Sequence, residues 1–292
     1  ATYGRGIWRS SIPIDTPDHD VRLLQIDVPE VDINCESFSP EIIVNNNGLN
    51  PITSFEIAYS IDGGTAETIE WEGTLAAGET TTVAIPQIIA SRGAHELEIN
   101  LSMINDAFQE NNEGSKNFYL NDAGTVGWIN TFENASDALI VVDANEENPT
   151  WERGTPSGMF LNDTSSGENA YATKLNGNYP NNTTSYLVSQ CYDLTNITNP
   201  VVEFNMAFKL EFEWDIVYME YSTNGSDWEI LGSFNDPNWY NNNEVPGEDC
   251  HNCPGAQWTG PSLTMQPYSY SLEDFTSEPS FMVRFVFRSD EA

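Results

Sequence analysis

Apolar and polar residues alternate along much of this chain, in short runs separated by glycine, asparagine, proline and aspartate. Alternation with a period of two, combined with many β-branched residues, is typical of strands that bury one face. The spacing of three to four residues expected of an amphipathic helix is almost absent. The clearest runs in the first part of the chain are residues 41–44, 55–61, 81–85 and 95–101. The pattern predicts an all-β protein.

Turn-forming sequences separate the runs of the first part. Residues 46–48, 62–64 and 77–79 read Asn-Asn-Gly, Asp-Gly-Gly and Ala-Gly-Glu, all of which tolerate a positive φ. About seven short strands within about 100 residues are typical of an immunoglobulin-like sandwich. We therefore expect such a sandwich over residues 21–121.

A second series of runs begins near residue 126 and has longer, more polar loops between its members. These runs are residues 127–133, 170–175, 185–189, 201–206, 215–221 and 280–287. Short strands joined by long loops favour a jelly-roll sandwich over residues 122–292. The polar turn at residues 121–124 is the expected boundary.

The charge of the chain restricts its partners. Among 292 residues, 10 are Lys or Arg and 45 are Asp or Glu, which gives a formal net charge of −35. Such a surface repels nucleic acid and anionic membranes, and no apolar run approaches the ~18 residues of a membrane-spanning helix. We expect no nucleic-acid partner and no membrane insertion. An acidic surface suits divalent cations with oxygen ligands, Ca²⁺ above all.

Catalytic motifs are absent from the sequence. The histidines are His19, His95 and His251, and no HExxH helix, G-x-S-x-G turn or phosphate-binding glycine loop occurs. Acidic residues are so frequent that a pair of carboxylates by itself indicates nothing. We expect that this chain is not an enzyme.

The four cysteines allow different interpretations. Cys250 and Cys253 are separated by two residues, as in half of a zinc site, but no second C-x₂-C pair exists. The competing interpretation, which we favour, is a local disulfide between Cys250 and Cys253 in an oxidising compartment. Cys35 falls in the other expected domain, and we expect Cys35 and Cys191 to be buried and free.

Residues 1–10, Ala-Thr-Tyr-Gly-Arg-Gly-Ile-Trp-Arg-Ser, resemble the closing strand of a sialidase-type or sortilin-type β-propeller. The resemblance implies that a propeller precedes this chain in a larger parent protein. Residues 1–20 are then a propeller-tail strand followed by a linker.

Residues 21–121 resemble the cell-adhesion-related domain found in bacteria (CARDB). The matching residues are Pro40, residues 44–48, the Trp-Glu-Gly-Thr-Leu-Ala-Ala-Gly of 71–78, residues 93–97 and residues 110–112. The resemblance implies an adhesion spacer that carries no chemistry.

Residues 122–292 resemble the MAM-like jelly rolls of secreted Bacteroidetes proteins and of immune inhibitor A-type metalloproteases. The matching residues are 132–133, 151–156, 166–171, 177–179, 187–194 and 221–228. The resemblance implies a secreted or cell-surface location. Family members continue into a further strand, so we expect this jelly roll to be truncated at its C-terminus. The groove beside the strand that precedes Ser289 is then open to a strand-donating partner.

The same resemblance implies a structural Ca²⁺ site. Glu133 supplies a carboxylate, and the loop from Asp163 to Asn169 supplies a carboxylate, an amide oxygen and carbonyls. The alternative is that Glu133 caps a turn and that the loop is only solvated.

Aromatic residues in the longest polar region suggest a ligand. Trp239, Tyr240 and Trp258 lie among asparagines, and exposed rings with amide neighbours are suited to stacking on sugars. The alternative, which we favour, is that these rings pack the loop onto its sheet.

Together these patterns predict non-catalytic, extracellular adhesion or spacer modules, stabilised by Ca²⁺, that meet a protein or glycan at the cell surface. The alternative is a set of accessory domains that target a secreted protease or glycosidase to its substrate or bind carbohydrate.

Overall fold

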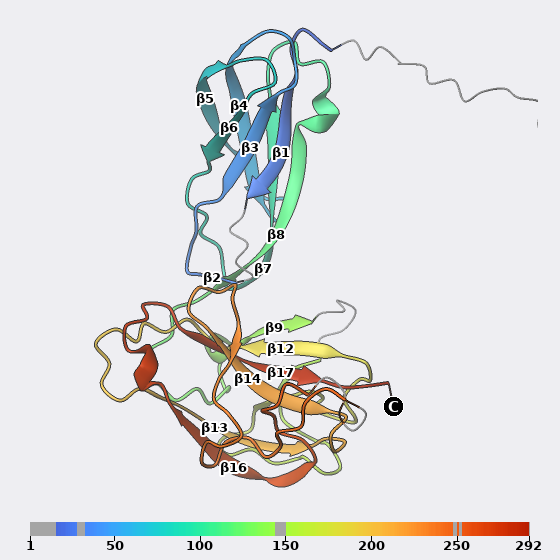
Figure 1. Cartoon of the computed structure of the whole chain (residues 1–292), viewed down its shortest axis with the longest axis vertical. Coiled ribbons are helices and arrows are strands. Elements are labelled where there is room, and N and C mark those ends of the chain that lie inside the picture. The colour runs from blue at the N-terminus through green and yellow to red at the C-terminus, as the bar shows by residue number, and fades with distance from the viewer. Residues whose placement is uncertain (1–15, 28–32, 144–149, 248–249, 251–252, 292) are drawn as a thin grey trace, which may run out of the picture. The chain divides into compact units, whose positions relative to one another are not determined.

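The computed structural model describes residues 16–27, 33–143, 150–247, 250 and 253–291 (Figure 1). These residues form strands and three short 3₁₀ turns, η1 (Gln109–Asn111), η2 (Ala135–Asp137) and η3 (Glu273–Phe275). The prediction of an all-β protein is confirmed. No helix in the described ranges is long and apolar enough to cross a membrane. The propeller-like residues 1–10 lie outside the described residues.

The chain divides into two compact units that are not separated by a single cut. The first unit comprises Ala1–Pro29, Ser39–Ile88 and His95–Phe118. The second comprises Glu30–Phe38, Ile89–Ala94 and Tyr119–Ala292. Two segments from within the expected first domain therefore belong to the second unit, and one of them contains Cys35.

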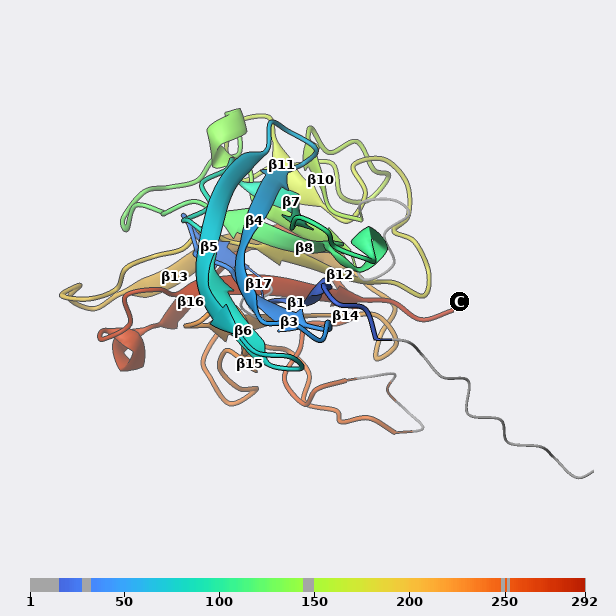
Figure 2. The same cartoon turned by 90° about the horizontal axis from the view of Figure 1, so that it is seen from above.

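The strands of the first unit form two sheets of an immunoglobulin-like sandwich, and β2 and the last residues of β8, which belong to the second unit, continue one of them. One sheet has the order β1 (Val21–Asp27), β3 (Glu41–Asn46), β6 (Thr80–Ala84). The other has the order β2 (Asn34–Cys35), β8 (Glu113–Asn121), β7 (Gly93–Ser102), β4 (Ile52–Ile61), β5 (Glu67–Leu75). Figure 2 shows β4 and β5 as one long curved hairpin. Alternate apolar side chains are buried between the sheets, as a period of two requires: Ile42, Val44, Ile57, Tyr59, Leu97, Ile99 and Leu101.

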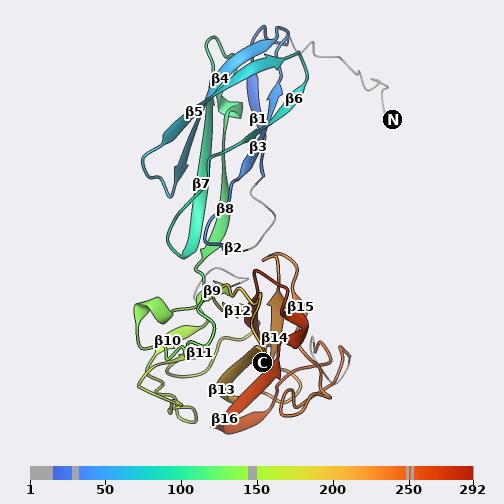
Figure 3. The same ribbon diagram turned by 90° about the vertical axis from the view of Figure 1, so that its left-hand side faces the viewer.

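The second unit is built around one five-stranded antiparallel sheet. Its order is β15 (Glu229–Ile230), β14 (Ile216–Ser222), β17 (Met282–Arg288), β12 (Thr184–Val188), β9 (Ile140–Asp143). Two smaller sheets accompany it. They are β13 (Val201–Lys209) with β16 (Pro261–Ser271), which run side by side in Figure 3, and β10 (Glu152–Gly154) with β11 (Ala170–Ala172).

The strand that precedes Ser289 is β17, and it lies in the middle of its sheet. It pairs with β14 over its whole length on one side and with β12 from Arg284 to Arg288 on the other. Our expectation of an open groove beside this strand is therefore wrong. The order of strands in the sheet does not follow their order in the sequence, so the last strand lies between two earlier ones. After β17, the Ser289 hydroxyl donates to the carbonyl of Pro180 at 2.7 Å, and Asn182 N–H donates to the carbonyl of Asp290.

Aromatic rings fill the space between the large sheet and the β13–β16 pair. Phe204 of β13 lies 4.9 Å from Phe285, 5.4 Å from Tyr268, 5.6 Å from Trp239 and 5.8 Å from Trp258, measured between ring centroids. Edge-to-face and offset contacts at these separations add to the free energy gained by burying the rings. Phe204 is therefore the centre of this core.

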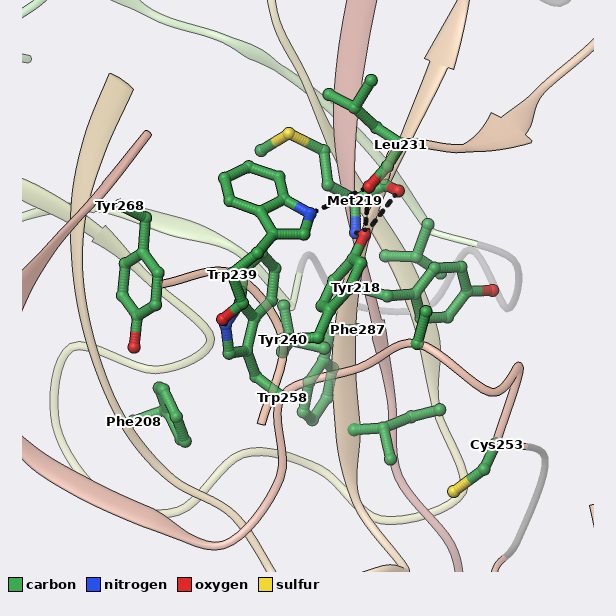
Figure 4. Packing of buried hydrophobic residues seen from close by; sticks show 14 of the residues in the cluster. Phe208, Tyr218, Met219, Leu231, Trp239, Tyr240, Cys253, Trp258, Tyr268 and Phe287 are labelled. Carbon is green, nitrogen blue, oxygen red and sulfur yellow. Dashed lines mark hydrogen bonds between the residues drawn. The ribbon is translucent and has the colours of Figure 1, made fainter. Parts of the chain in front are cut away.

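Backbone and side-chain groups of the loop between β15 and β16 cover the edge of β14 (Figure 4). Trp258 and Val217 exchange two backbone hydrogen bonds, at 2.7 and 2.9 Å. Next along β14, the Tyr240 hydroxyl accepts the N–H of Met219 at 3.1 Å and donates to the carbonyl of Leu231 at 2.8 Å. A phenol thus occupies a position where a neighbouring strand would supply backbone groups.

Both cysteine pairs form disulfides. Cys250 is bonded to Cys253, and Cys35 is bonded to Cys191, 156 residues further along the chain. Our expectation that Cys35 and Cys191 are free is wrong. Cys35 lies on β2, which pairs with the last residues of β8 in the second unit, and this brings its sulfur to Cys191 beside Met282.

We expect the double substitution Cys35→Ser with Cys191→Ser to lower the free energy of unfolding by about 2–5 kcal/mol, because the bond restrains a very long loop of the unfolded chain. Urea unfolding measures the change. The control is Cys250→Ser with Cys253→Ser, which opens a ring of only a few residues and should cost clearly less. Equal losses from the two double variants would contradict the prediction.

We expect Tyr240→Phe to cost about 1–3 kcal/mol, because the buried N–H of Met219 loses its partner while the ring area stays the same. The carbonyl of Leu231 keeps its bond from Trp239 Nε1 at 2.9 Å. The control is Tyr221→Phe, since the Tyr221 hydroxyl donates to the exposed Glu229 carboxylate at 2.7 Å and water replaces that bond. Thermal unfolding of both variants checks the difference, and a larger loss in Tyr221→Phe would refute it.

Candidate functional site

The structure brings together two of the three residues expected to bind calcium. Oε1 of Glu133 accepts the N–H groups of Glu168 and Asn169 at 2.9 and 2.8 Å, and Oε2 accepts the side-chain amide of Asn169 at 2.9 Å. Asp163 uses Oδ1 within its own loop, where it accepts the N–H of Thr164 at 2.9 Å. Glu133 therefore closes the loop through hydrogen bonds.

Electrostatics and sterics at Glu133 agree with this role. The N–H groups of Asn169 and Glu168 lower the pKa of the Glu133 carboxyl, because they stabilise its charged form. Gly167 has φ +63°, and a β-carbon there would collide with Oε1 of Glu133. The loop thus approaches the carboxylate as closely as only glycine allows.

The lone pairs that would face a cation at Glu133 already face N–H donors. Within the described ranges, no three side chains of His, Cys, Asp or Glu converge on a position for a metal ion. The turn-capping alternative describes what Glu133 does in this structure, and calcium binding at Glu133, Asp163 and Asn169 stays a prediction.

Two arginines that the sequence analysis did not single out hold the backbone around Glu133. Arg153 donates to the carbonyls of Phe132 and Asn134 at 2.6 and 3.2 Å. Arg92 donates to the carbonyl of Ala135 at 3.2 Å and pairs with Asp122 at 3.1 Å. The chain has only 10 Lys and Arg residues, so each arginine is uncommon. An arginine close to an acidic loop was therefore the signal in the sequence that could have identified these two residues.

The aromatic residues proposed for sugar stacking are buried. Trp239, Tyr240 and Trp258 are 2%, 5% and 0% exposed. Their polar atoms bond to the backbone, and Trp258 Nε1 donates to the carbonyl of Trp239 at 2.7 Å. The sugar-stacking interpretation is therefore wrong for these three rings, because a ring that packs the core has no free face. The favoured alternative, that they pack the loop, is what the structure shows.

Other rings, at the turn that follows β13, are open to solvent. Phe212 is 57% and Trp214 39% exposed. They are two residues apart, and this spacing looks the same as strand alternation in the sequence. That is why the sequence analysis missed them.

Buried polar groups hold this turn in place. The Thr259 hydroxyl accepts a hydrogen bond from the N–H of Glu213 at 2.8 Å. It donates one to the carbonyl of Asp215 at 2.9 Å. The carboxylate of the buried Asp215 accepts the Tyr179 hydroxyl, and burial together with this bond raises the pKa of Tyr179. The exposed rings of Phe212 and Trp214 therefore project from a fixed backbone.

The remaining groups with chemical potential have structural partners. Nδ1 of His95 lies 2.7 Å from Oδ2 of Asp62, and this hydrogen bond lowers the pKa of the Asp62 carboxyl. The ring of His95 packs against Phe118 with centroids 5.4 Å apart. Cys250 and Cys253 are buried and bonded to each other, so their sulfurs are not the thiolates that zinc requires.

Comparison with known proteins gives only distant structural likenesses. No family model matches the chain, and a search of curated proteins finds no match. The chain is similar to a CARDB domain from Pyrococcus furiosus, described in complex with di-metal ions, at 16% identity and a TM-score of 0.29. That match covers 38% of this chain and 94% of the domain.

Two further likenesses are of the same order. A domain described as belonging to a cell surface protein of Methanosarcina acetivorans matches at 17% identity and a TM-score of 0.31, covering 35% of this chain and 91% of that one. A beta-glucuronidase of Bacteroides uniformis matches at 8% identity and a TM-score of 0.24, covering 89% of this chain and 28% of the enzyme. None of these likenesses assigns the chain to a family.

Proposed function

We propose that this chain consists of non-catalytic β-sandwich modules of a secreted or cell-surface protein, which space or attach the rest of that protein outside the cell. The disulfide between Cys35 and Cys191 is the observation that carries the proposal. Buried disulfides between distant segments persist in oxidising compartments and are rare in the cytosol of most organisms.

The use of the candidate side chains also supports a structural role. Glu133 closes a loop, Tyr240 covers the edge of β14, and Cys250 and Cys253 are joined. Each of these groups has a partner within the fold. An enzyme places such groups where a substrate reaches them.

The oxidation state of the cysteines tests the proposed location. Protein collected from the medium of its native host should be unmodified by iodoacetamide under denaturing conditions, and should gain four carbamidomethyl groups after reduction. Mass spectrometry gives the count. Recovery of the protein only from the cytosol, with all four cysteines reactive before reduction, would refute an extracellular role.

A second candidate function, neutral-carbohydrate binding, is favoured by the turn that carries Phe212 and Trp214. Aromatic faces held on a fixed backbone stack on the apolar faces of sugars at a small entropic cost. A net charge of −35 disfavours anionic glycans, so the class considered is neutral oligosaccharides.

An array of neutral oligosaccharides tests this candidate. If a ligand is found, Phe212→Ala and Trp214→Ala should each weaken binding about tenfold, which corresponds to one lost stacking contact. The control is Phe234→Ala, which removes a ring that is also exposed but lies in another loop. No binding on the array, or equal weakening by the control, would rule out this surface.

A further inference from the structure

A carboxylate in the first unit is completely buried without a positive partner. Asp20, just before β1, is 0% exposed and takes part in no salt bridge within the described residues. The turn at residues 47–50 lies against its backbone, with the N–H of Asn47 donating to the carbonyl of Asp20 at 2.9 Å. At Gly48 a β-carbon would lie 2.8 Å from the backbone nitrogen of Asp20.

Two asparagine side chains face this carboxylate. Nδ2 of Asn47 lies 2.5 Å from Oδ2 of Asp20, and Nδ2 of Asn111 lies 3.1 Å from Oδ1. Both partners are neutral, so they satisfy hydrogen bonds but leave the charge uncompensated. A buried charge is costly unless a charge of opposite sign balances it.

An unpartnered oxygen atom lies at the same place. Oδ1 of Asn111 is buried and has no hydrogen-bond partner, and the same amide group reaches Asp20 through its nitrogen. That oxygen is therefore within the width of one amide group of the carboxylate. Buried acceptors without donors require an explanation.

We propose that Asp20, Asn47 and Asn111 bind one calcium ion. A half-turn of an amide exchanges its nitrogen and oxygen, and the two look alike in shape. The amide nitrogens of Asn47 and Asn111 now lie 2.5 and 3.1 Å from the carboxylate oxygens. After such a half-turn, the amide oxygens take the places of these nitrogens. Neighbouring oxygens around Ca²⁺ are about 3 Å apart, because each lies about 2.3–2.6 Å from the ion.

The donor set and its surroundings select the cation. All donors are oxygens, which suit a hard cation, and Ca²⁺ accepts uneven shells, whereas Mg²⁺ demands an octahedron and keeps its waters. Asp106 adds negative charge nearby, because its Oδ2 accepts the N–H of Val21 at 2.8 Å. One carboxylate in the shell implies weak binding, in the range of about 10⁻⁴–10⁻³ M found for extracellular modules.

Thermal unfolding of the whole chain with Ca²⁺, Mg²⁺ or EGTA tests the site. The melting temperature should rise as Ca²⁺ is titrated from about 0.1 to 10 mM, since a ligand that binds only the folded state stabilises it by mass action. Asn111→Asp places a second carboxylate in the shell. Its melting temperature should fall in EGTA, through repulsion from Asp20, and recover in Ca²⁺ by more than the wild type gains.

Two further variants locate the effect. Asp20→Asn should abolish the response to Ca²⁺, whereas Glu133→Gln should keep it, because Glu133 belongs to the second unit. If Asp20→Asn does not fold, Asn111→Asp carries the test alone. The proposal is overturned if the wild type ignores Ca²⁺ and Asn111→Asp is lowered equally in EGTA and Ca²⁺, the result expected of a purely hydrogen-bonded network. It is also overturned if Glu133→Gln removes the response.

Discussion

Hydrogen bonds from the loop between β15 and β16 hold the second unit together at the edge of β14. The β15 strand is only two residues long, so most of that edge has no strand beside it. The hydroxyl of Tyr240 and the backbone of Trp258 satisfy it instead. The rings of Tyr240 and Trp258 pack against each other, and Phe204 lies against Trp258. The polar tip of Tyr240 thus anchors the loop to β14, while the apolar bodies of both rings contribute burial.

The same property explains why the aromatic loop allowed two interpretations of the sequence. A ring with a polar tip is suited both to sugar stacking and to packing a loop that has backbone groups to satisfy. Composition does not separate the two roles. The difference lies in whether an unsatisfied strand edge is nearby, and that depends on which strands pair.

Local features of the fold could be predicted because local physics determines them. Alternation in β3, β4 and β7 buries one face of each strand, and glycine at position 48 allows the close approach of two backbones. Features that depend on distant segments could not. The partner of Cys35 is 156 residues away, and the central position of β17 depends on strands β12 and β14, which come earlier in the chain. At the candidate site, the contact of Glu133 with Asn169 was expected, whereas the donors that occupy its lone pairs are known only from the structure.

The bond between Cys35 and Cys191 changes what a protease does to this chain. The segments Ser39–Ile88 and His95–Phe118, most of the first unit, lie inside the loop that this bond closes. A single cut at any peptide bond in that loop opens a ring, and the two pieces stay covalently joined. Outside the cell, proteases are common and loop tips are their preferred targets. One cut in this loop would leave both modules attached to the rest of the protein.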